Sequence, residues 1–373
     1  MQDVSTELEG ASQTRGKQQP AAAVRTAVAG VGGYAGGELA RLLLTHPRLA
    51  ENKPLFLGRV ADDAEGGQVP LEQLHPQLAL GEGKRQPEVR AFSWELVRDA
   101  GTEIVFLALP HENSREWAPE WLEHGVRVID LSGAWRLNDA VNRAVYKLHD
   151  ADAALAEALQ AEAVFGAPEL HREAIAGARL VANPGCYATS IVLALAPLLR
   201  AGLVDVGHGI VCDAKSGVSG AGKAPSAKTH FMYAANNLSA YGVFTHRHTG
   251  ELLEQIGVGA EQITFTPHLL PIPRGILATL YVHFREPQTK AGIARVYHDF
   301  FAGSPMVRLY DTTLPQIQYS VRTCYADIGF QLAADGRRAV IVSCLDNLLK
   351  GASGQAVQNM NVMLGWPESE GLE

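Results

Sequence analysis

Residues 25–37 read RTAVAGVGGYAGG, and this stretch decides the fold predicted for the first half of the chain. Residues 25–29 have the composition of a short buried strand, and residues 38–44 (ELARLLL) have that of a helix. Between them the glycines follow the pattern GxxGxxG through Gly30, Gly33 and Gly36, with alanine at position 35. A strand, a glycine-rich turn and a helix are typical of dinucleotide-binding domains, whose helix N-terminus binds pyrophosphate. A plain turn is the alternative.

Further strands and helices alternate after this unit. Residues 55–59 indicate a second strand and its exit, and residues 103–109 (EIVFLAL) form a continuous apolar run. Such runs are typical of strands that are buried on both faces of a parallel sheet. Residues 114–124 suit a helix, and residues 127–131 suit the next strand. This alternation predicts a doubly wound α/β domain of the Rossmann type.

The pattern changes in the second half, where longer strand candidates follow one another with fewer helices. These candidates span residues 204–215, 263–270, 276–284, 307–311 and 338–345, and residues 216–222 form a glycine-rich loop. The pattern predicts an α+β domain with a mixed or antiparallel sheet. We therefore expect a disordered tail (1–23), a Rossmann domain (24–182) completed by a closing helix (347–373, with its clearest pattern over 347–365), and a catalytic and dimerisation domain (183–346).

Composition excludes several classes of function. The chain has 373 residues, of which 47% are hydrophobic and 19% charged, and its formal net charge is -8. That charge gives no general attraction to nucleic acid or to anionic membranes, and the chain has no apolar stretch long enough to span a bilayer. The first residues lack the apolar core of a signal peptide, so we expect a cytoplasmic protein. The four cysteines form no CxxC pair and the one tight histidine cluster has no helical metal spacing, so we expect no metal.

Residues 183–190 (NPGCYATS) place Cys186 where a strand gives way to an apolar helical run. Pro184 suits the first turn of a helix, and Gly185 allows the backbone close to a bound group. The positive end of a helix stabilises a thiolate, which is the nucleophilic form of cysteine. The segment therefore indicates a nucleophile aimed at an electrophilic carbonyl. A buried core cysteine is the alternative.

Arg59 follows the second predicted strand, at a position where domains that prefer NAD often carry an acidic residue. A cation there favours the 2′-phosphate of NADP, although Asp62 and Asp63 follow closely. Two later segments also suit ligands. Residues 216–222 combine hydroxyls with freely turning amides, as in an anion nest, and Asn347 could hydrogen-bond a nicotinamide amide or simply cap the last helix.

Taken together, the motifs resemble those of the N-acetyl-gamma-glutamyl-phosphate reductases, the arginine-pathway branch of the semialdehyde dehydrogenase group. The resemblance covers nearly the whole chain beyond the tail. It implies reduction of N-acetyl-L-glutamyl 5-phosphate to the 5-semialdehyde and phosphate by NADPH, through a thioester on Cys186, in a homo-oligomer (dimer or tetramer). The motifs that carry it are residues 30–39 (GVGGYAGGEL), 108–111 (ALPH), 130–132 (DLS), 135–137 (WRL), 166–170 (GAPEL), 183–189 (NPGCYAT), 213–222 (DAKSGVSGAG), 240–242 (AYG), 246–249 (HRHT), 266–271 (TPHLLP), 274–276 (RGI) and 346–356 (DNLLKGASGQA).

The resemblance also implies roles for particular residues. A general acid/base must handle the proton of the hemithioacetal, and we favour His246 over His248; His268 suits a structural role. The substrate-binding candidates are Arg136, Arg247 and Ser219, and Arg274 is a further basic candidate. The cofactor-binding candidates are Gly30, Gly32, Gly33, Tyr34, Gly36, Arg59, Leu109, Pro110, Ser216, Gly217 and Asn347.

Three positions depart from the family pattern, and two other functions stay open. Gly250 replaces a usual proline, Gly58 a usual serine, and Glu112 a usual glycine. None of these changes removes a reacting group. One alternative is a reductase of carrier-linked aminoadipyl phosphate in lysine biosynthesis, which shares the same chemistry. The other is a redox sensor that binds NADP and uses Cys186 as a switch thiol, without forming an acyl-enzyme.

Overall fold

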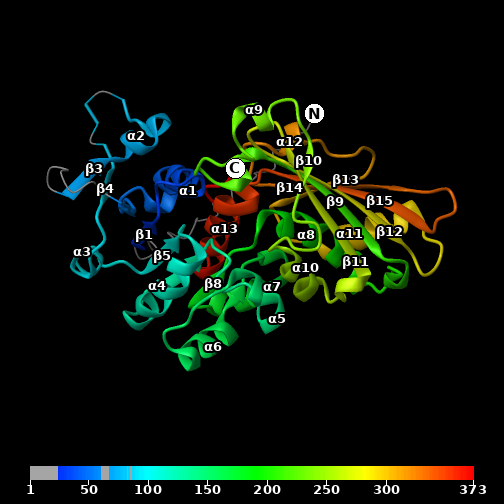
Figure 1. The fold of residues 1–373 in the computed structure, drawn as a ribbon, viewed down its shortest axis with the longest axis horizontal. Coiled ribbons are helices and arrows are strands. Elements are labelled where there is room, and N and C mark those ends of the chain that lie inside the picture. Colours follow the sequence, from blue (N-terminus) through cyan, green and yellow to red (C-terminus); the bar gives the residue numbers. More distant parts are fainter. Residues whose placement is uncertain (1–23, 60–66, 82, 85) are drawn as a thin grey trace, which may run out of the picture.

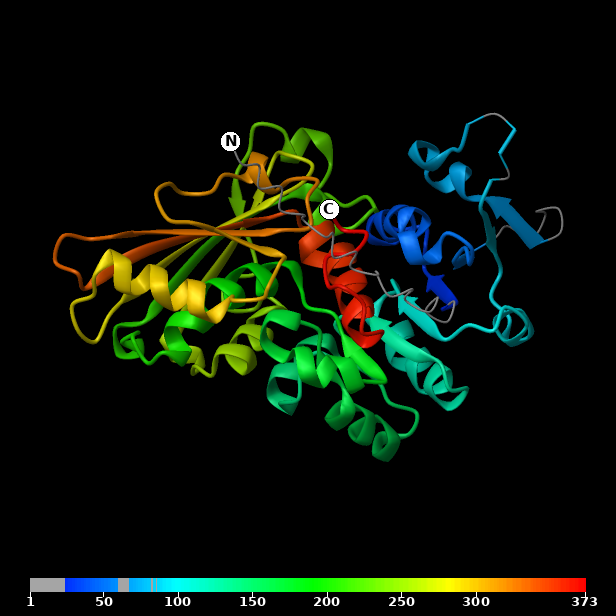
Figure 2. The ribbon, with the colours of Figure 1, turned by 180° about the vertical axis from the view of Figure 1, so that it is seen from behind.

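The computed structural model describes residues 24–59, 67–81, 83–84 and 86–373. The predicted disordered tail, together with Asp62 and Asp63, therefore lies outside the described residues. Two sheets lie side by side along the long axis of the molecule, and the C-terminal helix lies between them (Figure 1). The view from behind shows the same arrangement (Figure 2).

The first sheet has eight strands in the order β3-β4-β2-β1-β5-β6-β8-β7. All its pairings are parallel except that of β3 with β4. Residues of β1 and β5 are all buried, because helices cover both faces of a doubly wound sheet. The strands are β1 (Thr26–Ala29), β2 (Leu55–Leu57), β3 (Gln68–Pro70), β4 (Glu88–Arg90), β5 (Ile104–Leu107), β6 (Arg127–Asp130), β7 (Val164–Phe165) and β8 (Leu180–Ala182).

The helices of this half join the strands and pack on the sheet. The predicted strand, turn and helix around Gly30 are confirmed as β1 and α1, and the alternation of strands and helices is confirmed as well. Some boundaries differ: the helix predicted over 38–44 begins four residues earlier, the helix predicted over 114–124 begins three residues earlier, and the strand predicted over 103–109 spans only 104–107. The helices are α1 (Tyr34–Thr45), α2 (Leu71–Leu74), α3 (Trp94–Asp99), α4 (His111–Glu123), α5 (Ala140–Arg143), α6 (Ala153–Glu162) and α7 (Pro168–Gly177).

The second sheet is mixed, as predicted, with seven strands in the order β10-β11-β9-β12-β15-β14-β13. Two pairings are parallel, β11 with β9 and β13 with β14, and the other four are antiparallel. The strands are β9 (Ile210–Gly217), β10 (Ser239–Ala240), β11 (Ile263–Leu270), β12 (Ile276–His283), β13 (Val307–Tyr310), β14 (Ala326–Leu332) and β15 (Arg338–Leu345).

Helix α8 (Cys186–Arg200) supplies the centre of the second core. Its residues from Tyr187 to Leu198 are all buried, and the helix packs on β12, β14 and β15. Helix α10 (Thr249–Ile256) and helix α11 (Lys290–Phe300) pack beside it. Two short helices complete this half, α9 (Phe231–Ala234) and α12 (Ile317–Ser320).

Strand β9 differs from the prediction at both of its ends. The strand predicted over 204–215 begins only at Ile210, because Asp205 caps a 3₁₀ turn over Val206–His208 through the Gly207 N–H. At its other end β9 continues to Gly217, so the predicted loop over 216–222 is shortened, and a second 3₁₀ turn (Val218–Ala221) follows.

The closing helix is divided into two parts. A π-helix spans Leu349–Ser353, and α13 (Gly354–Met363) follows it directly. Every residue of α13 is buried, and Val357 and Met360 pack in one core with Val28 of β1 and Leu39 of α1. The last helix of the chain therefore covers the first sheet.

Candidate active site

Cys186 is the first residue of α8, and its loop is fixed from two sides. The Gly185 N–H donates to Glu251 Oε2 over 2.8 Å, and Arg136 Nε donates to the Asn183 carbonyl over 2.7 Å. Arg136 Nη1 also reaches Glu251 Oε1 over 3.1 Å, and Nη2 donates to the Leu131 carbonyl over 2.8 Å. Arg136 and Glu251 are both buried, so this ion pair holds the cysteine loop in place.

Gly185 allows a histidine to pack directly against the cysteine loop. A Cβ atom at this position would lie 2.4 Å from Nε2 of His248, closer than any real contact. Only glycine therefore lets the imidazole lie here, as the sequence argument about close backbone approach expects. His248 is 5% exposed and its Nδ1 has no hydrogen-bond partner among the described residues.

Burial governs the ionisation of the partly exposed Cys186. It raises the pKa of the thiol to about 11, while the positive charges of Arg247 and Arg136 act in the opposite direction. The sequence argument from the helix N-terminus predicts a lowered pKa instead. That prediction is wrong for the free protein, because loss of hydration outweighs the helix end and the two arginines.

His246 and His248 lie with their ring centroids 4.7 Å apart. His246 Nδ1 accepts the backbone N–H of His248 over 3.1 Å, so the neutral ring carries its proton on Nε2. Burial and Arg247 lower the pKa of His246 to about 4, and burial also lowers the pKa of His248 well below its usual value. Both rings are therefore neutral at pH 7, and His246 Nε2–H is available to donate.

Cys186 lies where two cavities meet. One cavity, of about 430 Å³, extends from the glycine-rich turn past Leu109 and Pro110 to Asn347. The other, of about 390 Å³, is lined by His246, Tyr187 and Tyr241. We call them the nucleotide cavity and the acyl cavity. The residues that line both are Cys186, Gly220, Arg247 and His248.

The glycine-rich turn fits a dinucleotide. Gly30 has φ of +89°, and a Cβ there would lie 2.4 Å from the Ala108 carbonyl oxygen. A Cβ at Gly36 would lie 2.5 Å from the Gly30 carbonyl oxygen, so α1 can begin close against the strand. Gly33 is the residue before α1, and both Gly33 and Tyr34 line the nucleotide cavity. The N-terminus of α1 thus opens into the nucleotide cavity, where its backbone amides can face a bound anion.

The structure places the remaining predicted cofactor residues in different regions. Asn347 lines the nucleotide cavity, where its amide already binds Ser219 Oγ over 2.9 Å and the Gly275 N–H over 2.8 Å. Ser216 and Gly217 line the acyl cavity, whereas Ser219, predicted to bind substrate, lines the nucleotide cavity. We predicted that Ser216 and Gly217 bind the cofactor and that Ser219 binds the substrate. Each therefore lines the cavity opposite to the one that its predicted role requires.

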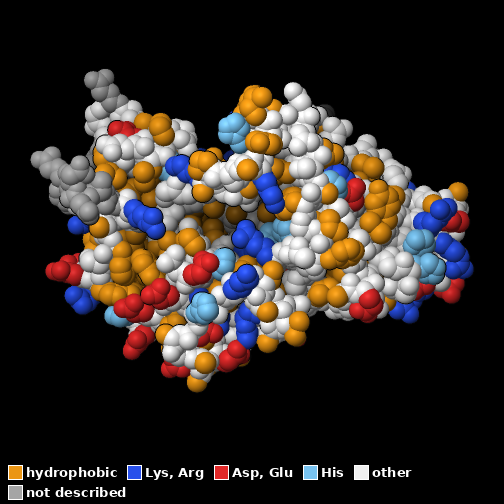
Figure 3. All heavy atoms as spheres, in the orientation of Figure 1, with side chains coloured by type: hydrophobic (Ala, Val, Ile, Leu, Met, Phe, Trp, Pro, Cys, Tyr) orange, Lys and Arg blue, Asp and Glu red, His pale blue; other side chains and the backbone are white. Residues whose placement is uncertain are grey.

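The predicted basic residues also lie in different parts of the structure. Arg247 is exposed and faces both cavities, and Arg59 is exposed just beyond the carboxyl end of β2. The carbonyl oxygen of Gly32 accepts from Lys223 Nζ over 3.1 Å. Arg274 instead forms an ion pair with Glu38 of α1 and so ties the two halves together. Figure 3 shows several basic side chains around the hollow at the middle of the face it draws.

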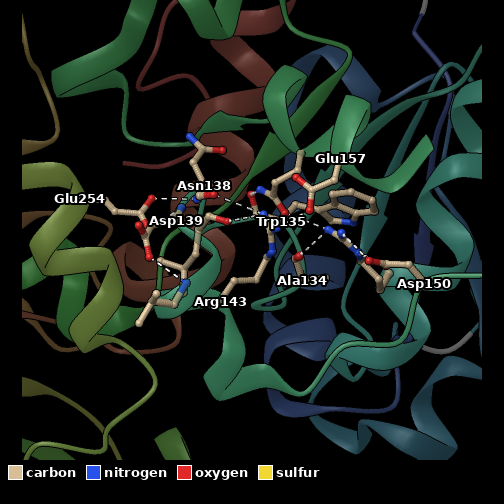
Figure 4. Close-up of polar contacts among 12 residues, drawn as sticks. Ala134, Trp135, Asn138, Asp139, Arg143, Asp150, Glu157 and Glu254 are labelled. Atoms are coloured by element: carbon tan, nitrogen blue, oxygen red, sulfur yellow. Dashed lines mark hydrogen bonds and ion pairs between the residues drawn. The ribbon is translucent and has the colours of Figure 1, made fainter. Parts of the chain in front are cut away.

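The segment after Arg136 is fastened to α10, the helix that follows His248. Glu254 accepts the backbone N–H groups of Asn138 over 2.8 Å and of Asp139 over 3.2 Å (Figure 4). On the other side of this segment, Arg143 pairs with Glu157. These contacts fix Arg136 relative to His246 and His248, because the segment after Arg136 is bonded to α10 and the two histidines directly precede that helix.

Three residues that contact the cysteine loop or line the cavities escaped the sequence analysis: Glu251, Lys223 and Lys228. Glu251 lies three residues after His248, so it shares a helix face with it, and that spacing was the available signal. The two lysines lie on the loop after the 3₁₀ turn, where local sequence carries no signal of a cavity. Among the described residues, no group of acidic, histidine or cysteine side chains could hold a metal ion, and no helix is long and apolar enough to cross a membrane.

The fold and the site define a semialdehyde dehydrogenase. Residues 25–178 match the family model of the semialdehyde dehydrogenase NAD binding domain, and residues 186–347 match that of its dimerisation domain. Aspartate semialdehyde dehydrogenase II from Vibrio cholerae, solved in complex with ASA, has a TM-score of 0.66 at 19% identity, over 92% of this chain and 98% of that one. At this identity the likeness establishes the fold.

Closer relatives identify the branch. The N-acetyl-gamma-glutamyl-phosphate reductase of Pelotomaculum thermopropionicum is 42% identical over 94% of this chain and 98% of its own. That of Desulforapulum autotrophicum is 40% identical over the same shares. The chain belongs to the family of N-acetyl-gamma-glutamyl-phosphate reductases.

Proposed function

We propose that this protein reduces N-acetyl-L-glutamyl 5-phosphate to N-acetyl-L-glutamate 5-semialdehyde and phosphate, with NADPH as the reductant. One observation carries the proposal. The Cys186 thiol lies where the nucleotide cavity meets the acyl cavity, beside His246 and His248. A nucleophile in that place can hold an acyl group within reach of a hydride donor.

Cys186 begins the reaction. An acyl phosphate is an activated carbonyl compound with a good leaving group, and a thiolate attacks it readily. The Sγ–C bond forms, the C–O bond to phosphate breaks, and the departing phosphate takes up the thiol proton. Because Arg247 lies beside Cys186, its charge favours the thiolate and can bind the departing phosphate. Arg136 acts as a positioning residue, since its guanidinium is bonded to the cysteine loop and to Glu251.

Bound NADPH supplies a hydride to the carbonyl carbon of the thioester. His246 Nε2–H would donate a hydrogen bond to the carbonyl oxygen, whose negative charge grows as the hydride arrives; the Nδ1 contact with the His248 N–H, which leaves the proton on Nε2, supports this role. This is the donor half of the acid/base role predicted from the sequence. When the thiohemiacetal collapses, the C–S bond breaks, the aldehyde leaves and Cys186 is regenerated.

The residues that would hold the cofactor are those of the glycine-rich turn. Backbone amides at the start of α1 suit the pyrophosphate, and Leu109 and Pro110 line the path toward Asn347. Arg59, exposed at the carboxyl end of the strand next to β1, suits the 2′-phosphate.

We also propose that the protein is a cytoplasmic homo-oligomer. Its domain boundaries are those predicted from the sequence, between residues 182 and 183 and between residues 346 and 347. The match to a dimerisation domain supports the oligomer, and so does an exposed apolar surface on that part of the chain. Phe231 and Met232 of α9 are each 76% exposed and Phe244 is 73% exposed. Such a surface is typical of a contact between subunits.

The test is an assay of the reverse reaction. We expect phosphate-dependent reduction of NADP⁺ with N-acetylglutamate 5-semialdehyde, and much slower reduction with aminoadipate semialdehyde. Cys186→Ser should bind NADPH normally and lose nearly all turnover, because an alcohol ionises far less readily than a thiol. Faster turnover of the aminoadipate compound would favour the lysine-pathway alternative. Normal binding of NADPH by the wild type without turnover of either aldehyde would favour the redox sensor.

A further inference from the structure

The acyl cavity has a one-sided charge. Its lining contains two cationic side chains, Arg247 and Lys228, and no aspartate or glutamate among its described residues. The rest of the lining is hydroxyl groups, aromatic rings, glycines and the reacting residues. A cavity of this kind suits a ligand with more than one negative group.

Both cations line the acyl cavity, but only one of them also lines the nucleotide cavity. Arg247 is one of the four residues shared with the nucleotide cavity, so it lies at the junction where Cys186 is. Lys228 belongs to the acyl cavity and is absent from the lining of the nucleotide cavity. Its Nζ lies 5.8 Å from the ring centroid of Tyr241, which likewise lines only the acyl cavity.

Lys228 is free to bind a ligand. It is exposed, and among the described residues it forms no ion pair; its one recorded contact is with the face of Tyr241. A cation over an aromatic face keeps most of its charge available. The long flexible stem of a lysine then allows the ammonium to adjust to an anion.

We propose that Lys228 binds the α-carboxylate of the substrate in the acyl cavity, away from the junction with the nucleotide cavity. This inference rests on the proposed function. The substrate has an acyl phosphate at one end and a carboxylate at the other, with three carbons between the two carbonyl carbons. Arg247 faces the phosphate beside the thiol, and Lys228 faces the carboxylate.

The experiment pairs one substitution with two aldehydes. N-acetylglutamate 5-semialdehyde carries the carboxylate, and 4-acetamidobutanal is the same molecule without it. We expect Lys228→Met to lower kcat/KM roughly 10- to 100-fold for the first, mainly through KM, because one charged contact is lost. For the second aldehyde the variant should match the wild type. Lys228→Arg should recover most of the loss.

Lys290→Met is the matched control, because it removes the same charge from the exposed start of α11 and should change neither substrate. Equal losses with both aldehydes after Lys228→Met would overturn the carboxylate contact, and so would no loss with either.

A second measurement does not need turnover, so it separates this inference from the proposed reaction. N-acetylglutamate should protect Cys186 of the wild type from iodoacetamide much better than 4-acetamidobutyrate does, since only the former has both carboxylates. In Lys228→Met the two protectants should become similar. Protection by N-acetylglutamate that is unchanged by the substitution overturns the inference, whatever the assay with aldehydes gives.

Discussion

At the scale of single residues, the thiol of Cys186 is harder to ionise than a free cysteine. Because burial raises its pKa to about 11, the thiolate fraction of the free protein at pH 8 is small. We expect its alkylation by iodoacetamide to be slower than that of a free thiol at pH 8 and to rise about tenfold per pH unit toward pH 11. Arg247→Ala should slow it further, since a favourable charge is removed. A rate that levels off below pH 8 would mean that the helix end outweighs burial.

Cofactor choice also rests on one residue in our proposal. Arg59→Ala should weaken binding of NADPH by about 1.5–3 kcal/mol, the typical contribution of a charge-assisted contact. Binding of NADH should hardly change, because it lacks the 2′-phosphate. Titration of both nucleotides by fluorescence measures the two losses. Equal losses would assign Arg59 a structural role instead.

At the scale of elements, the sequence was informative wherever local periodicity determined the structure. The strand, turn and helix around Gly30 and the strand over 263–270 are as predicted. Strand β14 (Ala326–Leu332) was missed, because its glycine and polar residues interrupt the apolar pattern and its stability comes from pairing with β13 and β15. The position of Lys228 in the acyl cavity could not be predicted, since it depends on which loops meet in space, whereas Glu251 had only its spacing from His248 as a signal.

The π-helix is an element with a direct effect on the nucleophile. A Cβ at Gly351 would lie 2.7 Å from the Cβ of Cys186 and 3.3 Å from the Asp346 carbonyl oxygen. Gly351→Ala should therefore displace the cysteine and lower kcat, at a cost in stability of about 1–3 kcal/mol. Gly177→Ala, at the exposed end of α7 where an added Cβ meets nothing within 4 Å, is the control. Activity of Gly351→Ala equal to that of the control would show that the thiol tolerates the shift.

At the scale of the whole molecule, the chain crosses between the two sheets more than once. It builds all the strands of the first sheet, then those of the second, and returns through the π-helix to place α13 on the first. Ser353 Oγ donates to the Ala35 carbonyl over 2.7 Å, and Arg127 donates to the Met363 carbonyl over 3.0 Å. Side chains of the nucleotide-binding half and of α13 therefore share one hydrophobic core.

Removing that helix should unfold the first half. A chain ending at residue 346 loses Val357, Met360 and Met363 from the core, each worth about 1.5–3 kcal/mol when buried. Their sum is comparable to the whole stability of a typical domain. We expect the truncated chain to lose NADPH binding and to be cut rapidly by proteases within residues 24–182. A protease-resistant truncated chain that still binds NADPH would contradict this.

The position of α13 also has a consequence for the order of synthesis. The ribosome makes β1 and α1 first and the helix that covers them last, so the nucleotide-binding sheet leaves the ribosome with part of its apolar face uncovered. The second sheet, made from a continuous stretch of chain, can be completed before translation ends. In this protein α13 thus has to be synthesised before the sheet that contains β1 can reach its native packing.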